Sequence, residues 1–158
     1  RDRMRVFRCT SETIRKYKDQ FVELYKRFIY VHYPEKVDQG ILTSVDFKKS
    51  IEKISDYIDA QEGVVFVAQE EEVICGYAHG YIRMFLDEKR LMLDGLVVKP
   101  EYMRKKIGQQ LQNELEKYAK ENNCDVMELF VTTNNASAES FYRKNGFVDS
   151  RLHMIKRL

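Results

Sequence analysis

A short basic stretch is the first feature of this sequence that could do chemistry. Residues 100–111 read PEYMRKKIGQQL, in which Arg104, Lys105 and Lys106 precede Gly108. The stretch separates an apolar run from a segment whose apolar residues recur at helical spacing. Free backbone N–H groups at a helix N-terminus bind phosphate, and a glycine lets the backbone come close to it. Taken alone, the stretch is equally consistent with an anion site and with a basic first turn on a solvated helix.

Three titratable residues interrupt runs that otherwise resemble strands. Asp94 lies within RLMLDGLVV, where a lone acid is either exposed on an edge or functional. Glu128 interrupts VMELFV and is a competing candidate for a general base, although a solvated strand end explains such a residue more often. His79, in YAHGY, could also be a base, but a hydrogen-bonded strand histidine is the more common case. A base must reach the proton that it removes, so the sequence leaves all three open.

Composition and charge exclude several classes of protein. The 158 residues are 44% hydrophobic, which suits one domain over residues 1–158. Lys+Arg 27 against Asp+Glu 25 gives a net charge of +2, too balanced to indicate nucleic acid. No apolar run approaches about 18 residues and the start has no apolar signal core, so we expect no membrane partner. Cys9, Cys75 and Cys124 are scattered without metal-like spacing, which predicts buried thiols, no metal and a cytoplasmic protein.

Apolar periodicity and turn residues give the order of the expected elements. Strands are expected at 6–9, 64–68, 73–85, 90–98 and 126–131, with one or two more after residue 147. Helices are expected from Thr10 or Ser11 to about Val31, after Thr43 or Ser44, over 107–121 and over 135–146. Polar or Pro/Gly-containing breaks are expected at 32–40, 69–72 and 86–89.

This order predicts a mixed α/β domain. Antiparallel hairpins come first, and a strand–helix–strand crossover follows between residues 90 and 131. The two strands of such a crossover are expected to be parallel neighbours. The few charges in 126–131 indicate a strand that is covered on both faces. Gly146 is expected to end the last helix in the left-handed conformation.

A second motif gives the basic stretch a specific meaning. Residues 134–147, NNASAESFYRKNGF, together with PEYMRKKIGQQL, resemble the GNAT superfamily of acetyl-CoA-dependent N-acetyltransferases, whose element order covers the whole chain. The family pattern N-x-x-A-x-x-F-Y-x-x-x-G-F is met at Asn135, Ala138, Phe141, Tyr142, Gly146 and Phe147. In the family's pyrophosphate loop, Gln/Arg-x-x-Gly-x-Gly/Ala, Gly108 matches the last small position. Met103 and Lys106 depart from the pattern.

The resemblance implies a mostly antiparallel sheet with a splayed central parallel strand pair, helices on both faces, and acetyl-CoA as the cofactor. The cofactor-binding residues that it implies are Leu96, Val97, Val98, Met103, Arg104, Lys105, Lys106, Ile107, Gly108, Gln109, Asn135, Ala138 and Tyr142. Backbone groups around Leu96 and Val98 would hold the pantetheine arm and the thioester oxygen. Tyr142 would protonate the leaving thiolate, and Asp94 would act through water as the general base. Simple ring packing for Tyr142, and simple helix capping for Asn135, are the alternatives.

The acceptor site implied by the resemblance lies near the first two helices, the hairpin around 73–85 and the C-terminal strands. Its candidate residues are Tyr30, Tyr33, Glu35, Tyr81 and Arg83, with Tyr77 and Arg151 nearby. Aromatic walls with one acid suit a cationic amine. The arginines would instead suit a carboxylate. A small amine, an antibiotic, a polyamine, and a peptide or protein amine all remain open as acceptors, as do a monomer and a homodimer.

Two other classes of function compete with direct acetyl transfer to a primary amine. An acyl-CoA-binding sensor or pseudoenzyme is left open by the departures at Met103 and Lys106, whereas the retained Tyr142 argues against it. Nucleic-acid binding through the basic residues 104–106 is disfavoured by the near-neutral charge and by the lack of stacking aromatic residues beside them.

Overall fold

The computed structural model describes residues 3–158, and its centre is one five-stranded sheet in the order β1-β2-β3-β4-β5. The strands are β1 Met4–Arg8, β2 Val64–Glu70, β3 Val73–Phe85, β4 Glu88–Val98 and β5 Val126–Leu129. The helices are α1 Ser11–Lys16, α2 Lys18–His32, α3 Pro34–Asp38, α4 Ile41–Ser44, α5 Phe47–Asp59, α6 Ile107–Glu121 and α7 Ala136–Lys144. Neighbouring strands are antiparallel except β4 and β5, which are parallel. The predicted mixed, mostly antiparallel α/β fold is confirmed.

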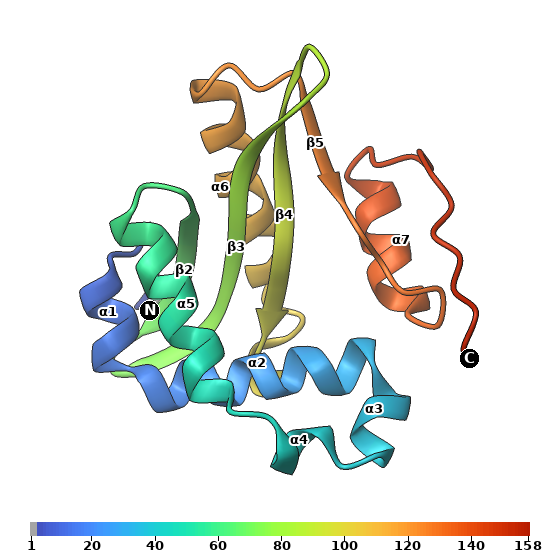
Figure 1. Ribbon diagram of the computed structural model, residues 1–158. Coiled ribbons are helices and arrows are strands. Elements are labelled where there is room, and N and C mark those ends of the chain that lie inside the picture. Colours follow the sequence, from blue (N-terminus) through green and yellow to red (C-terminus); the bar gives the residue numbers. More distant parts are fainter. Residues whose placement is uncertain (1–2) are drawn as a thin grey trace.

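Helices cover both faces of this sheet (Figure 1). Helices α1, α2 and α5 pack on one face, where Val65 and Val67 of β2 meet Phe21 of α2. Helix α6 packs on the other face, over a core that includes Val64 and Phe66, and Tyr142 of α7 belongs to the same core. The side chains of β2 contribute alternately to the two cores, because successive side chains of a strand point to opposite faces. Each fully buried apolar side chain of this size stabilises the fold by about 1.5–3 kcal/mol.

A β-bulge at Asp94 exchanges the two faces of β4. Strands β3 and β4 pair on both sides of Asp94, which itself has no partner on β3. Leu91 and Leu93 belong to the core under α6, and after the bulge Leu96 and Val98 pack against that same core. A strand has a side-chain period of two, so one extra residue is needed for odd and even positions to reach the same side. The bulge therefore sets which side chains of the open end of β4 are buried.

Strands β4 and β5 separate after a short paired segment. Their register runs from Arg90 opposite Val126 to Leu93 opposite Leu129. Strand β4 continues to Val98, whereas the chain after β5 turns away toward α7 (Figure 1). Among residues 3–158, the β5-facing side of β4 has no strand partner beyond Leu93. The predicted splayed parallel pair is confirmed.

The first helical region differs from the single helix expected up to Val31. Helices α1 and α2 are separated at Tyr17, whose φ of −108° and ψ of 30° are not helical. The Tyr17 hydroxyl donates to Glu72 Oε1 at 2.8 Å, so a contact with the β2–β3 turn holds this residue. The apolar stripe continues across the break, which explains why spacing alone gave one helix.

The segment 32–40 is not simply a break. Helix α3 begins at Pro34, since the missing N–H of proline is not needed in the first turn of a helix. Helix α4 follows Gly40, whose φ is +85°. Helix α5 begins later than expected, because Asp46 rather than Thr43 or Ser44 is its N-cap and accepts from the backbone N of Lys49 at 3.2 Å.

The C-terminal expectations need the largest correction. Residues 148–158, called the C-terminal tail below, contain no strand in this structure, although one or two were predicted. Strand β5 ends at Leu129 and all four of its residues are half-buried, so the expectation of a strand covered on both faces is wrong. Gly146 does adopt the left-handed conformation after α7, with φ +93°. Cys9 and Cys75 are buried as predicted, but Cys124 is half-exposed.

Two searches of residues 3–158 bear on partners. None of the helices there combines the length and the apolar character needed to cross a membrane. No group of three or more His, Cys, Asp or Glu side chains in that range could hold a metal ion.

Candidate active site

The basic stretch forms the loop that leads into α6. Pro100–Tyr102 is a 3-10 turn, and the Tyr102 hydroxyl donates to Glu70 Oε1 at 2.9 Å, which ties the loop to β2. Arg104 and Lys106 have φ values of +71° and +61°, and Lys106 is the N-cap of α6. The left-handed conformation costs a non-glycine residue about 1–2 kcal/mol. The family resemblance predicts glycine at position 106, because glycine adopts this backbone conformation without strain. Lys106 adopts the same conformation at a cost in strain, and its side chain is exposed.

The first turn of α6 lies directly against the open end of β4. A Cβ added at Gly108 would lie 3.7 Å from Leu96 Cδ2 and 3.9 Å from Val98 Cγ2. Exposed Arg104 and Lys105 stand beside this helix N-terminus. Free backbone N–H groups, positive charge and close approach to an unpaired strand together fit the pyrophosphate and pantetheine arm of a coenzyme A molecule.

Most predicted cofactor residues in this region use their side chains inside the protein. Ile107 is buried in the core under α6, Val97 is buried in the opposite core, and Leu96 and Val98 are half-buried. Met103 is half-exposed and its sulfur lies 3.9 Å from Arg27 Nη2. These residues would therefore contribute backbone groups rather than side chains to a ligand, as expected for Leu96 and Val98.

Gln109 connects the anion loop to the helix that carries Tyr142. Its Nε2 donates to Asn145 Oδ1 at 2.6 Å, and Asn145 Nδ2 donates back to Gln109 Oε1 at 3.1 Å. This amide pair joins the first turn of α6 to the end of α7. The side chain of Gln109 is thus engaged within the fold, and only its backbone remains for a cofactor.

Tyr142 is buried on α7, with 8% of its surface exposed. Its ring centroid lies 5.2 Å from that of Phe141 and 5.6 Å from that of Phe147. Burial raises the pKa of Tyr142 to about 12. At neutral pH this phenol keeps its proton and is suited to donate a hydrogen bond.

Asn135 joins the start of α7 to the end of α2. Its Oδ1 accepts from the backbone N of Ala138 at 3.1 Å, so it is the N-cap of α7. Its Nδ2 lies 3.4 Å from Nδ1 of His32, the last residue of α2. The His32 ring stands 4.3 Å from that of Phe28, and burial lowers the pKa of His32. Sequence reasoning missed His32; its only signal was the helical spacing from Phe28.

Asp94 lies where β4 and β5 separate, directly after the last register pair of Leu93 and Leu129. Its side chain is 55% exposed, and its Oδ2 lies 3.5 Å from Nδ1 of buried His79. Burial first, and then neighbours that include the negative charge of Asp94, raise the pKa values of Tyr25, Tyr77 and Tyr81. The bulge therefore presents one carboxylate to a group of aromatic side chains from α2 and β3. A β-bulge next to an active site commonly re-aims a side chain in this way.

The expectation that His79 is a fully hydrogen-bonded strand histidine is wrong. In the described part of the chain, its buried Nε2 has no hydrogen-bond partner, and only Nδ1 meets Asp94. A Cβ at Gly63 would lie 3.3 Å from that Nε2, so this glycine leaves room for the imidazole. His79 is thus held beneath the carboxylate rather than built into a closed polar network.

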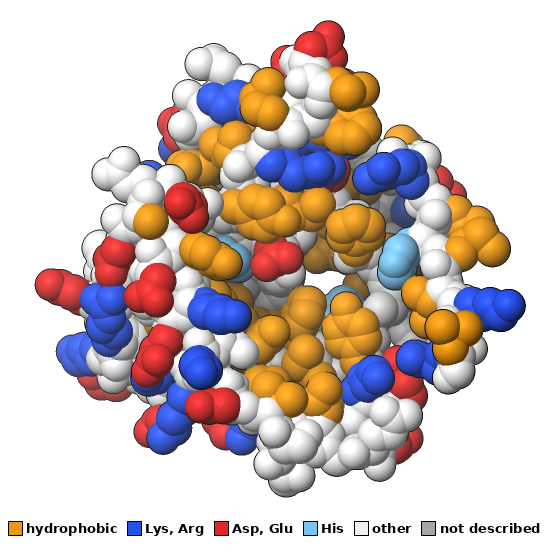
Figure 2. Space-filling model, viewed as in Figure 1, with side chains coloured by type: hydrophobic (Ala, Val, Ile, Leu, Met, Phe, Trp, Pro, Cys, Tyr) orange, Lys and Arg blue, Asp and Glu red, His pale blue; other side chains and the backbone are white. Residues whose placement is uncertain are grey.

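A hollow opens on this face of the molecule. Figure 2 shows it near the centre of the view, lined by hydrophobic side chains, with acidic and histidine side chains at its rim. Phe28 of α2 lies against β4 beside the bulge, because a Cβ at Gly95 would lie 3.9 Å from Phe28 Cε1. The side chain of Asp94 is itself 55% exposed, so a small molecule can reach its carboxylate.

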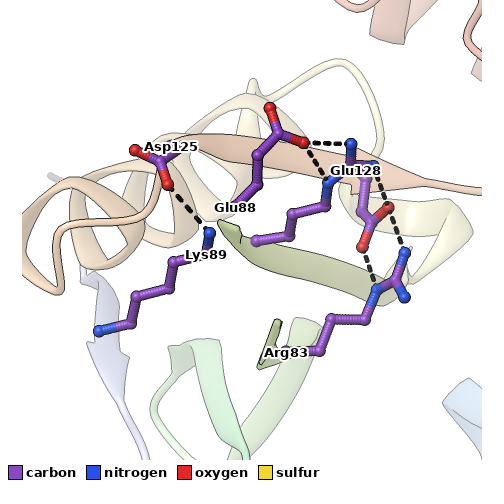
Figure 3. A network of polar contacts seen from close by, with 6 residues as sticks. Arg83, Glu88, Lys89, Asp125 and Glu128 are labelled. Atoms are coloured by element: carbon purple, nitrogen blue, oxygen red, sulfur yellow. Dashed lines mark hydrogen bonds and ion pairs between the residues drawn. The ribbon is translucent and has the colours of Figure 1, made fainter. Parts of the chain in front are cut away.

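The sequence favours a solvated strand end for Glu128, but the structure places this residue inside an ion cluster. Its side chain is 15% exposed and binds Arg83, whose Nη2 lies 2.9 Å from Oε1. Arg90 Nη1 donates to the same oxygen at 3.1 Å (Figure 3). Hydrogen bonding from Arg83 first holds the pKa of Glu128 below its usual range. The cluster makes Glu128 a poor general base and occupies Arg83.

The family of the chain follows from its sequence match. Residues 20–147 match the acetyltransferase (GNAT) family. This chain belongs to the GNAT acetyltransferase family. The predicted family is thereby confirmed, while the enzymatic activity, the acetyl-CoA cofactor and the roles of single residues stay predictions.

Individual relatives of this GNAT protein are more distant. A spermidine N(1)-acetyltransferase of Thermoplasma acidophilum is 40% identical over 68 residues, which are 43% of this chain and 42% of that protein. A tetramutant of the BH1408 protein of Bacillus halodurans superimposes with a TM-score of 0.80 at 19% identity, covering 98% of this chain and 99% of that one. The aminoglycoside N-acetyltransferase AAC(6')-Iy, solved with CoA, gives 0.72 at 16% identity, covering 98% and 94%. At these identities the solved structures show a shared fold.

The remaining acceptor candidates of this GNAT chain differ in their exposure. Tyr30 is exposed near the end of α2, and Tyr33 and Glu35 follow it in exposed positions. Tyr81 is half-buried on β3, on the same side of the strand as His79. The structure thus brings Tyr81 together with Asp94, and leaves the other three toward solvent.

Proposed function

We propose that this GNAT acetyltransferase transfers the acetyl group of acetyl-CoA directly to a primary amine of a small polycationic acceptor, within one domain formed by residues 1–158. The observation that carries the proposal is Asp94, a half-exposed carboxylate at the point where β4 leaves β5. Aromatic side chains surround it, and such an acid attracts a cationic amine. Three free cysteines, two of them buried, support a reducing cytoplasm as the compartment.

The cofactor side of the site supplies binding and a hydrogen-bond donor. When bound, acetyl-CoA supplies an acetyl thioester that an amine can attack. The backbone from Arg104 to Gln109 would hold its pyrophosphate, and backbone groups of Leu96 and Val98 would hold the pantetheine arm. A backbone N–H at the thioester oxygen would act as an oxyanion donor worth about 3 kcal/mol. Asn135 and Ala138 form the adjoining first turn of α7.

The acceptor side supplies the base. A cationic amine first gives one proton to Asp94 through an intervening water, and the neutral nitrogen then forms the new N–C bond as the C–S bond breaks. The second proton lost by that nitrogen balances the departing thiolate, so that coenzyme A leaves as the thiol. The Nδ1 atom of His79 lies against that carboxylate and helps to orient it. Tyr142 donates a hydrogen bond to the departing sulfur, because a phenol with a pKa of about 12 retains its proton at neutral pH.

A polyamine is the acceptor class that the residues favour. Tyr81 near Asp94, together with exposed Tyr30, Tyr33 and Glu35 at and after the end of α2, offers aromatic faces and a second acid. Arg83 is bound to Glu128, which removes the main argument for an acceptor with a carboxylate. The spermidine acetyltransferase relative and the aminoglycoside acetyltransferase neighbour both support a small molecule with several amino groups.

A thiol-release assay with acetyl-CoA tests this function. The panel contains spermidine, an aminoglycoside, a simple alkyl monoamine and a peptide with a free N-terminus. We expect kcat/KM for spermidine to exceed that for the monoamine by about tenfold or more, since each extra desolvated cation–aromatic contact contributes on the order of 1–2 kcal/mol. Tyr142→Phe should lower kcat while calorimetry shows unchanged coenzyme A binding. Coenzyme A binding without turnover of any amine would identify a sensor instead, and a preference for the peptide would reject the acceptor class.

A further inference from the structure

A chain of side-chain amides lies between α6 and α7. Gln109, in the first turn of α6, and Asn145, the C-cap of α7, exchange two hydrogen bonds of 2.6 and 3.1 Å. The Nε2 atom of Gln109 also lies 3.3 Å from Oε1 of Gln112, a fully buried residue further along α6. Gln112 Nε2 in turn donates to Glu116 Oε1 at 3.0 Å. The two helices are therefore connected by polar groups that find their partners within the protein.

The reciprocal bonds between Gln109 and Asn145, called the amide pair below, add direction to an apolar contact. Tyr142 of α7 lies in the same core as Ile107 and Leu111 of α6. The hydrophobic effect that holds such a core together has no direction. Hydrogen bonds, in contrast, weaken steeply when their length or their angle changes, and the amide pair has to keep two of them at once. The pair therefore fixes how far along its own axis α7 stands against α6.

Asn145 stands about one helical turn after Tyr142 and is bonded to the same turn. Its backbone N donates to the carbonyl oxygen of Tyr142 at 3.0 Å. Its Nδ2 donates to the carbonyl oxygen of Phe141 at 2.9 Å. Residues three apart on a helix are neighbours on its surface, so a contact that holds Asn145 also holds the side of the helix that carries the phenol. Asn145 thus connects the turn of Tyr142 to Gln109.

We propose that Gln109 and Asn145 are positioning residues for acetyl transfer, and that their amide pair sets where the Tyr142 hydroxyl stands relative to coenzyme A bound at the start of α6. This role rests on the proposed function, in which the backbone from Arg104 to Gln109 holds the pyrophosphate and Tyr142 donates to the departing sulfur. The cofactor and the phenol are then held by two different helices. The amide pair joins a residue of the anion loop to the turn that carries the phenol.

Loss of the amide pair should lower the rate of transfer more than the affinity for the cofactor. The backbone N–H groups that would hold the pyrophosphate stay in place when either side chain is changed. The phenol, in contrast, loses its fixed distance from the sulfur, and a misplacement of about 1 Å can cost about 100-fold in rate. A residue that only stabilises the fold would lower the free energy of unfolding and leave the turnover of the folded enzyme unchanged.

Turnover in the thiol-release assay, with the preferred amine of the panel, tests this role. Asn145→Ala and Gln109→Leu each remove the amide pair, and Gln109→Leu retains the bond from Asn145 to Phe141. Asn113→Ala is the matched control, since Asn113 is an exposed residue of α6 that accepts from Gln109 Nε2 at 2.8 Å. We expect both disrupting variants to lower kcat by about tenfold or more, with the Kd for coenzyme A within about threefold of wild type by calorimetry. The control should match wild type, and thermal unfolding checks that all variants fold.

Combination with Tyr142→Phe separates positioning from other roles. Asn145→Ala should lower kcat of the Tyr142→Phe enzyme by less than about twofold, because the group that it positions is already gone. Equal losses in both backgrounds overturn the positioning role, and so does a loss of coenzyme A affinity as large as the loss in kcat. Wild-type kcat in both disrupting variants, beside a slow Tyr142→Phe, rejects this role alone. A Tyr142→Phe enzyme as fast as wild type rejects the donor role in the proposed function and the positioning role with it.

Discussion

The paired and unpaired parts of β4 make opposite use of the same strand. In the paired part, Arg90 to Leu93 lie beside β5, and both backbone and charges are satisfied within the protein. Lys89 and Asp125 add reciprocal bonds at its start, of 2.7 and 2.9 Å. In the open part, from Asp94 to Val98, the side of the strand that faced β5 has no strand partner in the described chain. One continuous strand thus takes part in a closed ion cluster at one end. At its other end, the backbone N–H and C=O groups that face β5 have no strand partner in the described chain.

This difference teaches how a rigid element can carry a ligand site. The closed part fixes the direction of both strands, so their separation after Leu93 is determined by packing rather than by loop flexibility. The open part then presents backbone groups and Asp94 in fixed positions, as a preorganised site requires. The following substitutions act on one part and should leave the other intact.

Asp94→Asn should have the largest effect, on the open part. A positioned general base contributes about 100- to 10,000-fold, so kcat/KM should fall by at least about 100-fold at neutral pH. The loss should shrink at high pH, where the amine arrives without its extra proton. Steady-state rates across pH measure this. Asp87→Asn, at the exposed β3–β4 turn, is the matched control and should behave as wild type. A loss of equal size at every pH would remove Asp94 as the base.

Glu128→Ala should destabilise the closed part. Removing this carboxylate leaves Arg83 and Arg90 side by side without their shared partner. We expect the free energy of unfolding, measured with denaturant, to fall by about 2 kcal/mol, between the values for exposed and for fully buried pairs. The acetyl-CoA KM of the folded enzyme should change little. Glu139→Ala is the control, since its pair with Arg143 is exposed and should cost far less.

The pH dependence of stability tests the same cluster. The folded-state pKa of Glu128 is lowered, with the hydrogen bond from Arg83 as the first cause. Its contribution is therefore fully present above the pKa of about 4.3 of an unfolded glutamate and is lost as the pH falls through the lowered folded-state pKa. Wild type should lose more stability than Glu128→Ala over this acid range. Equal slopes for the two proteins would argue against a charged Glu128 in the fold.

Gly108→Val should weaken coenzyme A binding by about tenfold, because a branched side chain at 3.7 Å from Leu96 and 3.9 Å from Val98 separates α6 from β4. Isothermal titration calorimetry measures it. Gly108→Ala is the matched control: its Cβ would stand at ordinary contact distance, and alanine favours the helix. Unchanged affinity in the valine variant would reject the anion-loop assignment.

Lys106→Gly should have the smallest effect and should be stabilising. Glycine adopts a φ of +61° without strain, so the free energy of unfolding should rise by about 1 kcal/mol. Lys105→Gly, one residue earlier, has no such strain to relieve and should be neutral or destabilising. If the backbone binds the pyrophosphate, Lys106→Gly should keep its coenzyme A affinity within about threefold. A larger, salt-dependent loss would assign the binding to the lysine charge.

The sequence by itself determined what depends on local spacing. The N-x-x-A-x-x-F-Y pattern gave α7 with Asn135 as its cap, and the run before Gly108 gave a loop and a helix start. Apolar periodicity gave the cores, and the family resemblance implied the separated parallel pair. The helix, its cap and the loop rest on residues close in the chain, for which residue type and spacing carry the information.

Only the tertiary structure decided features that join distant segments. It placed Asp94 at a bulge above His79, paired Glu128 with Arg83, and brought His32 to Asn135. It also left the C-terminal tail without strand pairing among residues 3–158. Such pairings depend on register and on which groups satisfy one another across the fold. A lone acid or histidine in a sequence does not reveal its partner, because one residue of register reverses the face it occupies.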